Sequence, residues 1–109
     1  MAFSIDGTTF RLPSGAWTIR QDAIVREDGG HHTTIADLTI EIEGRPAMRG
    51  KLRFTDEAFQ RFPGRGDDEK SAAVARRLMG WIAENGLLDG FFLRVDADDA
   101  GVQISDSSR

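Results

Sequence analysis

The chain has 109 residues and a formal net charge of −4, with 39% hydrophobic and 29% charged residues. This length and composition are typical of one folded domain with its own core, so we expect residues 1–109 to form a single domain. The absence of cysteine excludes disulfides, thiol nucleophiles and cysteine-ligated metal centres. The negative net charge disfavours nucleic acid as a partner.

No apolar run approaches the roughly 20 residues that span a bilayer, which argues against a membrane partner. Residues 1–20 alternate polar and apolar positions, unlike the continuous apolar segment of a signal peptide. We therefore expect a cytoplasmic protein. Of the 14 basic residues only Lys51 and Lys70 are lysine. This arginine bias, together with abundant alanine, glycine and aspartate, indicates a GC-rich bacterial genome.

The first structural signal lies in residues 3–12, which alternate apolar and polar residues on both sides of Asp6-Gly7. An Asp-Gly dipeptide between two alternating runs predicts a β-hairpin. The following Pro13-Ser14-Gly15 ends this pattern.

Residues 16–27 and 33–43 form the next two alternating segments. A two-residue turn at Asp28-Gly29 would bring the apolar positions of both segments to the same side of a sheet. In that register Arg20 lies opposite Asp37, which is a favourable cross-strand pair.

Residues 47–54 continue the sheet, with apolar residues at most even positions and basic residues at odd positions. A three-residue loop at Gly44-Arg45-Pro46 would pair Leu38 with Leu52 and keep charged residues opposite one another. The central strands are therefore expected to have one apolar face and one charged face.

Two helices should follow. Thr55 is a suitable N-cap for a short helix that ends before Pro63-Gly64. A longer helix is expected to begin after Asp67 or Asp68 and to end at Asn85-Gly86. Its apolar stripe, at helical spacing, comprises Val74, Ala75, Leu78, Trp81 and Ile82.

Residues 91–95 and 102–105 predict a closing hairpin. The helix stripe and the apolar face of the sheet can cover each other, which is the arrangement of a two-layer α+β domain. We predict an α+β fold in which an antiparallel β-meander of about five to seven strands packs on one long helix, with a short helix in addition.

Residues 35–93 resemble a small uncharacterised bacterial family that has a β-meander followed by one long charged helix. The resemblance includes a short turn that begins Phe-Thr-Asp-Glu-Ala-Phe at Phe54. It implies a fold and no activity.

The motifs that could carry catalysis or bind metal are incomplete. His31 and His32 are the only histidines, and adjacent strand residues point to opposite faces, so they predict no metal pair. Residues 96–101 lack the fifth and twelfth ligands of a calcium loop. The acids that follow Gly66 would repel phosphate. We expect no catalytic residue, no metal site and no cofactor.

The charged face carries the candidate contact residues for a partner. In the expected register Ile24 and Ile35 lie there as diagonal neighbours, either exposed or covered by the N-terminal hairpin. An exposed apolar pair within charged surroundings is typical of a protein contact. The charged members are Arg20, Arg49, Lys51 and Arg53. Acids on neighbouring strands could also neutralise these cations and leave an ordinary solvated face.

The leading hypothesis is a non-enzymatic protein-interaction or regulatory module whose partner is another protein or a second copy. Within the basic cluster of residues 45–65, no outward aromatic residue lies between the cations to stack on bases, which again disfavours nucleic acid. The alternative is a small-ligand-binding or weakly enzymatic domain. Its pocket would lie between sheet and helix, near His32, Gln21 and Trp17.

Overall fold

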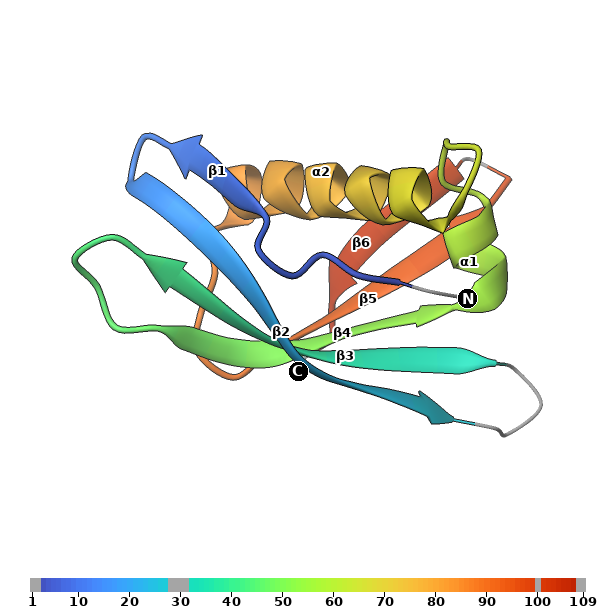
Figure 1. The fold of residues 1–109 in the computed structure, drawn as a ribbon, viewed down its shortest axis with the longest axis horizontal. Coiled ribbons are helices and arrows are strands. Elements are labelled where there is room, and N and C mark those ends of the chain that lie inside the picture. Colours follow the sequence, from blue (N-terminus) through green and yellow to red (C-terminus); the bar gives the residue numbers. More distant parts are fainter. Residues whose placement is uncertain (1–2, 28–31, 100, 108–109) are drawn as a thin grey trace.

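The computed structural model describes residues 3–27, 32–99 and 101–107. Six strands and two helices form within these residues (Figure 1). In chain order they are β1 (Thr9–Leu12), β2 (Gly15–Glu27), β3 (Thr33–Ile42), β4 (Met48–Thr55), α1 (Asp56–Gln60), α2 (Asp67–Asn85), β5 (Phe91–Asp98) and β6 (Gly101–Asp106). The predicted α+β class, with a mostly antiparallel sheet and two helices, is confirmed.

The strands form one sheet in the order β1-β2-β3-β4-β5-β6. Every neighbouring pair is antiparallel except β4 and β5, which run parallel. The prediction of a purely antiparallel meander is therefore wrong at this pair. Both helices lie between β4 and β5 in the chain, and such a helical crossover returns the chain to the same end of the sheet, as parallel pairing requires.

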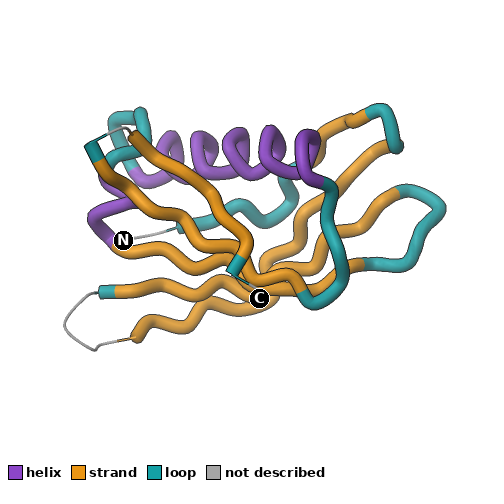
Figure 2. The backbone as a smooth tube through the Cα atoms, turned by 180° about the vertical axis from the view of Figure 1, so that it is seen from behind, coloured by secondary structure: helices purple, strands orange, loops and turns teal. Residues whose placement is uncertain are grey.

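Both helices lie on one face of the sheet, with α2 running across it (Figures 1 and 2). The core fills the space between these two layers. Its largest fully buried apolar side chains are Ile19, Leu38, Ile40, Leu52, Phe54, Phe59, Val74, Leu78, Ile82, Leu93 and Val95. No helix of the described residues covers the opposite face of the sheet, which we call the helix-free face.

The N-terminal segment departs from the predicted hairpin. Asp6-Gly7 does form a turn, but the residues before it form no strand. Instead Phe3 and Ile5 are buried in the core, and the Phe3 ring lies 4.7 Å from that of Phe54. The alternating pattern of residues 3–12 fits both a hairpin and an extended segment that inserts Phe3 and Ile5 into the core. The structure has the second arrangement, which buries both apolar side chains between the two layers. This segment cannot cover the helix-free face.

The pairing of β2 with β3 differs from the predicted register. Arg20 lies opposite Thr39 and not Asp37, and the register shifts between Gln21 and Ala23. Asp22 is therefore the extra residue of a β-bulge, which inserts one unpaired residue into a strand. The turn predicted at residues 28–29 lies outside the described residues.

The bulge reverses which face each later β2 side chain occupies, because alternation has a period of two. Ile24 is paired with Ala36, which is buried on the helix side. Val25 is paired with Ile35 on the helix-free face. The prediction that Ile24 and Ile35 share the charged face is therefore wrong, and Val25 takes the place of Ile24.

The pairing of β3 with β4 is shifted by two residues from the expected register. Leu38 lies opposite Gly50, and Leu52 lies opposite Ala36. An even shift leaves every side chain on its predicted face. Leu38 and Leu52 are buried and Arg49 is exposed, so the predicted division into an apolar and a charged face is confirmed for these strands.

The helix boundaries follow local signals. The Thr55 hydroxyl accepts a hydrogen bond from the Ala58 backbone at 3.1 Å and caps α1. The 19-residue α2 begins at Asp67 with Gly66 as its N-cap, slightly before the predicted start, and no side chain caps it. Its C-cap is Gly86, whose φ of 75° favours glycine. The stripe residues of α2 are buried except Trp81, which is half-buried at its margin. The closing hairpin of β5 and β6 is confirmed and is longer than predicted.

Candidate functional site

A groove of about 640 Å³ lies on the helix-free face, over β2, β3, β4 and the start of β5. Its charged and aromatic lining includes Arg20, Asp22, Asp37, Arg49, Lys51 and Phe92. Alternation along each strand brings these residues together, because they occupy outward positions of neighbouring strands. Three of them, Arg20, Arg49 and Lys51, were predicted as contact residues, and the structure brings them into one groove.

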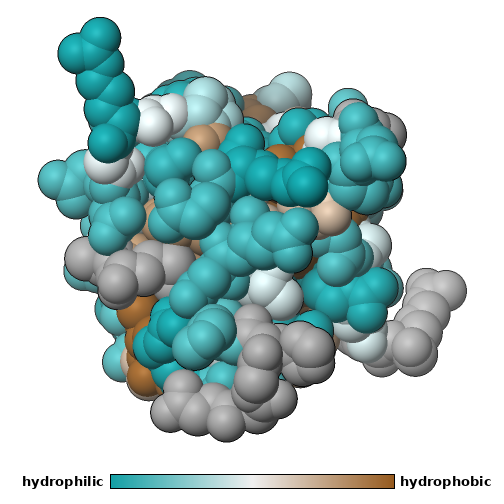
Figure 3. Space-filling view, turned by 90° about the vertical axis from the view of Figure 1, so that its right-hand side faces the viewer, coloured by the Kyte–Doolittle hydropathy of each residue, from teal (hydrophilic) through white to brown (hydrophobic). Residues whose placement is uncertain are grey.

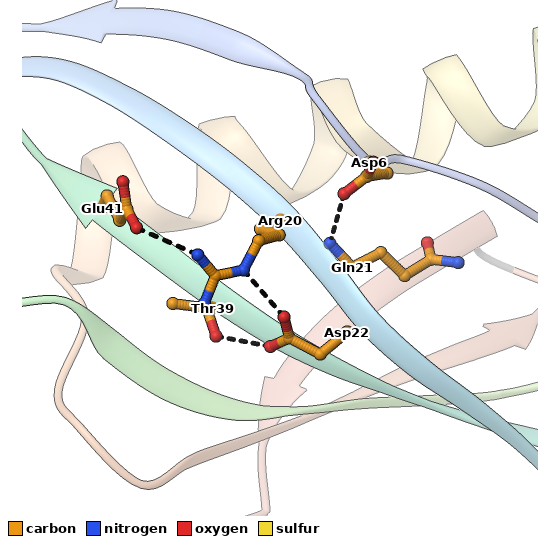
Figure 4. Close-up of polar contacts among 6 residues, drawn as sticks. All are labelled: Asp6, Arg20, Gln21, Asp22, Thr39 and Glu41. Carbon is orange, nitrogen blue, oxygen red and sulfur yellow. Dashed lines mark hydrogen bonds and ion pairs between the residues drawn. The ribbon is translucent and has the colours of Figure 1, made fainter.

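The bulge residue Asp22 organises one wall of the groove (Figure 4). Its carboxylate accepts a hydrogen bond from the Thr39 hydroxyl at 2.5 Å and one from Arg20 Nε at 2.8 Å. Arg20 also contacts Glu41, with 3.3 Å between Nη1 and Oε1. Thr39 is 1% exposed although it faces this side, so these charged side chains cover its hydroxyl.

This network sets the ionisation of the wall. The hydrogen bond from Thr39, followed by that from Arg20, lowers the pKa of Asp22, and the charge of Arg49 acts in the same direction. The hydrogen bond to Asp22 raises the pKa of Arg20. Both groups are therefore charged at neutral pH and neutralise each other.

The two basic residues of β4 differ in their partners. Lys51 Nζ lies 2.6 Å from the Asp37 carboxylate. The guanidinium of Arg49, by contrast, forms no hydrogen bond or ion pair with any residue that the structure describes. The Arg49 backbone, in contrast, is held on both sides: its N–H donates to the Asp89 carboxylate at 2.8 Å, and its carbonyl accepts from the Gly90 N–H at 2.7 Å. The groove thus contains one cation with its donors available.

Gly50 allows β4 and β5 to approach beneath the groove. A Cβ atom at this position would lie 2.3 Å from the Phe91 carbonyl oxygen and 2.4 Å from the Phe91 ring. The Phe91 side chain occupies the space on the core side that a side chain of residue 50 would fill. The next residue, Phe92, then points outward and is half-buried in the groove.

The residues expected to form a pocket between sheet and helix do not converge. Trp17 is buried near the start of β2, with Nε1 donating to the Ser14 hydroxyl at 3.0 Å. Gln21 holds the N-terminal segment, since its Oε1 accepts from the Ile5 backbone at 3.1 Å. His32 is exposed at the other end of the β2–β3 hairpin, where its carbonyl accepts from the Asp56 backbone.

A different hollow, of about 520 Å³, lies between the sheet and the C-terminal end of α2. Trp17 lines it with the apolar side chains of Met48 and Ile82. Gln21 and His32 take no part in it, so only one residue of the predicted pocket is found beside a cavity. His31 lies outside the described residues.

The remaining predicted contact residues lie beyond the groove. Arg53 and Ile35 are paired on the helix-free face, towards the tip of the β2–β3 hairpin. Ile24 lies on the other face and is 42% exposed. The sequence did not predict the hydrogen bond between Thr39 and Asp22, because no local sequence pattern indicates the bulge. The outward Phe92 could have been found from the alternation of β5.

Comparison of the chain with family models, with curated proteins and with solved structures gives no match. The resemblance of residues 35–93 to an uncharacterised bacterial family therefore stays a prediction.

The described residues contain no group of three or more histidines or carboxylates placed to hold a metal ion. Within the same part of the chain, neither helix has the length and apolar character needed to cross a membrane.

Proposed function

We propose that the protein is a non-enzymatic interaction module of the bacterial cytoplasm that binds an acidic segment of a partner protein in the groove of the helix-free face. The observation that carries the proposal is the guanidinium of Arg49, which lies in a groove whose other charges are paired. A guanidinium presents several donors in a planar fork that matches a carboxylate.

The balance of charges favours a carboxylate over a polyphosphate. Asp22 and Asp37 line the groove beside the cations, and Glu41 adjoins it. A chain of phosphates would be repelled by these acids, whereas one carboxylate needs only the single available cation. The net charge of −4 also disfavours the binding of a polyphosphate.

Phe92 supports a peptide ligand and not an isolated anion. Its half-buried ring offers apolar contact in the groove that Arg49 lines, on the strand position paired with Lys51. Aromatic and arginine residues are enriched where protein interfaces gain most of their binding energy. The groove volume of about 640 Å³ also lies within the usual range for ligand sites.

The test uses pairs of short peptides that are identical except for Glu or Gln, titrated into isotope-labelled protein and followed by amide chemical shifts. The glutamate peptides should shift resonances of Arg49 and Phe92, and their glutamine counterparts should not. Arg49→Gln should weaken binding at least about ten-fold, equivalent to about 1.4 kcal/mol. Arg77→Gln, an exposed change on α2, is the matched control. Equal binding of both peptide types, or by both variants, would refute the proposal.

A second candidate function is small-ligand binding in the hollow beside Trp17. Its lining is largely apolar, with Leu12, Met48 and Ile82 contributing, and it lies between the two layers. Trp17 and Trp81 are the only tryptophans, so their fluorescence reports on this end of the molecule. A change with small apolar ligands that is abolished by Ala83→Phe, which narrows the hollow without adding a tryptophan, would favour this candidate. No change across a ligand panel would remove it.

A further inference from the structure

The edge of β2 is covered over only half its length. β1 has four residues and pairs with β2 only from Gly15 to Thr18. The Ile19 backbone is bonded to residues 7 and 8, and the Gln21 N–H donates to the Asp6 carboxylate at 2.8 Å. Beyond this point, no described residue pairs with the edge of β2 that faces away from β3.

The uncovered part of β2 also exposes apolar side chains on both faces. Ile24 is 42% exposed on the helix side, and Val25 is 54% exposed on the helix-free side. Figure 3 views the end of the molecule where the β2–β3 hairpin projects. Most of that surface is hydrophilic, and hydrophobic surface gathers at its lower left (Figure 3). An open strand edge with exposed apolar residues is a site for pairing with another strand.

The usual protection of such an edge by charged side chains is weak here. The Arg26 guanidinium is turned towards α1, where Nη2 lies 3.0 Å from the Asp56 carboxylate. The same side chain donates to the Thr34 hydroxyl at 3.0 Å. Arg26 is thereby held against its own chain and leaves the neighbouring backbone accessible.

We propose that residues 22–26 pair antiparallel with the same residues of a second copy, joining the two sheets edge to edge. Centring the two-fold axis on Val25 would oppose Ile24 to Arg26, and centring it on Ala23 would oppose Asp22 to Ile24. Centring it on Ile24 opposes Ile24 to its copy and Ala23 to Val25, which are favourable apolar pairs. The charged residues at the two ends of the segment, Asp22 and Arg26, lie on opposite faces of the sheet, so this register places no like charges against each other.

The backbone direction fits this pairing. Before the bulge, Ile19 and Gln21 direct their N–H groups away from β3, as their bonds to residues 8 and 6 show. The bulge adds one residue, so strand alternation next directs the N–H and C=O of Ile24 towards the open edge. The residue at the proposed two-fold axis therefore has its backbone groups available to the second copy.

This is an isologous interface, the commonest kind in symmetric dimers. It extends the sheet across two copies and leaves the groove around Arg49 open on each. The proposal does not rest on the proposed function, because Arg49 takes no part in it. Arg49→Gln should dimerise like the wild type, and a monomeric variant should still bind acidic peptides in the groove.

A cysteine cross-link tests the register directly, because the natural chain has no cysteine. Residues directly opposite in antiparallel strands have Cα atoms roughly 4.5–5.5 Å apart, within the range that a disulfide bridges. Ile24→Cys should form a covalent dimer under mild oxidation. Leu88→Cys, at another exposed apolar position, should stay largely monomeric. Equal cross-linking of the two variants would overturn the proposal.

Light scattering from micromolar to millimolar protein provides the second measurement. The mass of the wild-type protein should double as concentration rises. Ile24→Lys and Val25→Lys should each remain monomeric with an unchanged circular dichroism spectrum, whereas Leu88→Lys should dimerise like the wild type. A wild-type protein that stays monomeric throughout would refute the proposal, as would dimers that persist in both edge variants.

Discussion

The two faces of the sheet follow the same alternation of side chains but are stabilised in different ways. On the helix side, Leu38 and Leu52 are completely removed from water beneath α2 and the N-terminal segment. On the helix-free face, ion pairs such as Lys51–Asp37 are exposed. Burial supplies most of the stability of a fold, and exposed ion pairs supply little. The covered face therefore carries most of the stability of the fold, and the helix-free face contributes little of it.

The sharpest test compares one phenylalanine on each face. Phe54 is 1% exposed and stacks with Phe59 at 5.8 Å between ring centroids. Phe54→Ala should lower the free energy of unfolding by about 3–5 kcal/mol. Phe92→Ala, on the helix-free face, should lower it by about 1 kcal/mol because its ring is half-buried. Urea denaturation measures both, and equal losses would contradict the division of roles between the faces.

The next comparison concerns two glycines. Gly50→Ala would place Cβ against the Phe91 backbone, and we expect a loss of about 2 kcal/mol or more because backbone cannot rotate away. Gly80→Ala in α2 meets no atom within 4 Å and should stabilise the protein by about 0.5–1 kcal/mol through helix propensity. Thermal unfolding of both variants checks the signs. A neutral Gly50→Ala would show that β4 and β5 can separate locally.

The ion pair between Arg26 and Asp56 should produce a smaller, pH-dependent effect. The hydrogen bond from Arg26 lowers the pKa of Asp56. The pair therefore stabilises the folded state fully above the unfolded-state pKa of about 3.9. This stabilisation is lost as the pH falls through the lower pKa of Asp56 in the folded state. Because the pair is partly exposed, Asp56→Asn should cost under about 1 kcal/mol at neutral pH.

Urea titrations from neutral pH down to about pH 3 measure this difference. The gap in stability between the wild type and Asp56→Asn should narrow on acidification. A gap that stays constant or widens would show that the pair does not stabilise the folded state. Asp68→Asn, an exposed change in the first turn of α2, is a suitable control.

The smallest effect is expected for an ion pair on the helix-free face. Lys51→Ala removes the contact with Asp37, whose side chain is partly exposed, as is that of Lys51. We expect a change in unfolding free energy of about 0.5 kcal/mol or less, and less still at high salt. A loss comparable to that of Phe54→Ala would mean that the charged face stabilises the fold after all.

Much of the architecture could be predicted from local signals. Alternation in residues 33–43 and 47–54 correctly assigned Leu38 and Leu52 to the core and Arg49 to the surface. These assignments survived a two-residue error in strand register, because an even shift conserves the face of every side chain. The N-cap at Thr55 and the end of α2 at Gly86 could also be predicted from the sequence, since capping depends on neighbouring residues.

Part of the candidate site was predicted as well. Arg20, Arg49 and Lys51 were assigned to the charged face, and the structure places them in one groove. The assignment of Ile24 to that face is wrong because the bulge at Asp22 reverses the face of every later side chain in β2. The residue types around the bulge give no sign of it in the sequence. The pocket expected near His32 does not form, because Trp17 and His32 lie at opposite ends of the β2–β3 hairpin and the Gln21 side chain bonds to the N-terminal segment.

The sequence by itself determined the α+β class, the N-cap of α1, the end of α2 and the apolar face of the central strands, because each depends on periodicity and capping over a few residues. Only the tertiary structure decided the parallel pairing of β4 with β5, the burial of Phe3 and Ile5, and the bulge at Asp22. These features depend on contacts between residues far apart in the chain. Alternating patterns fit several such arrangements equally, and packing selects among them.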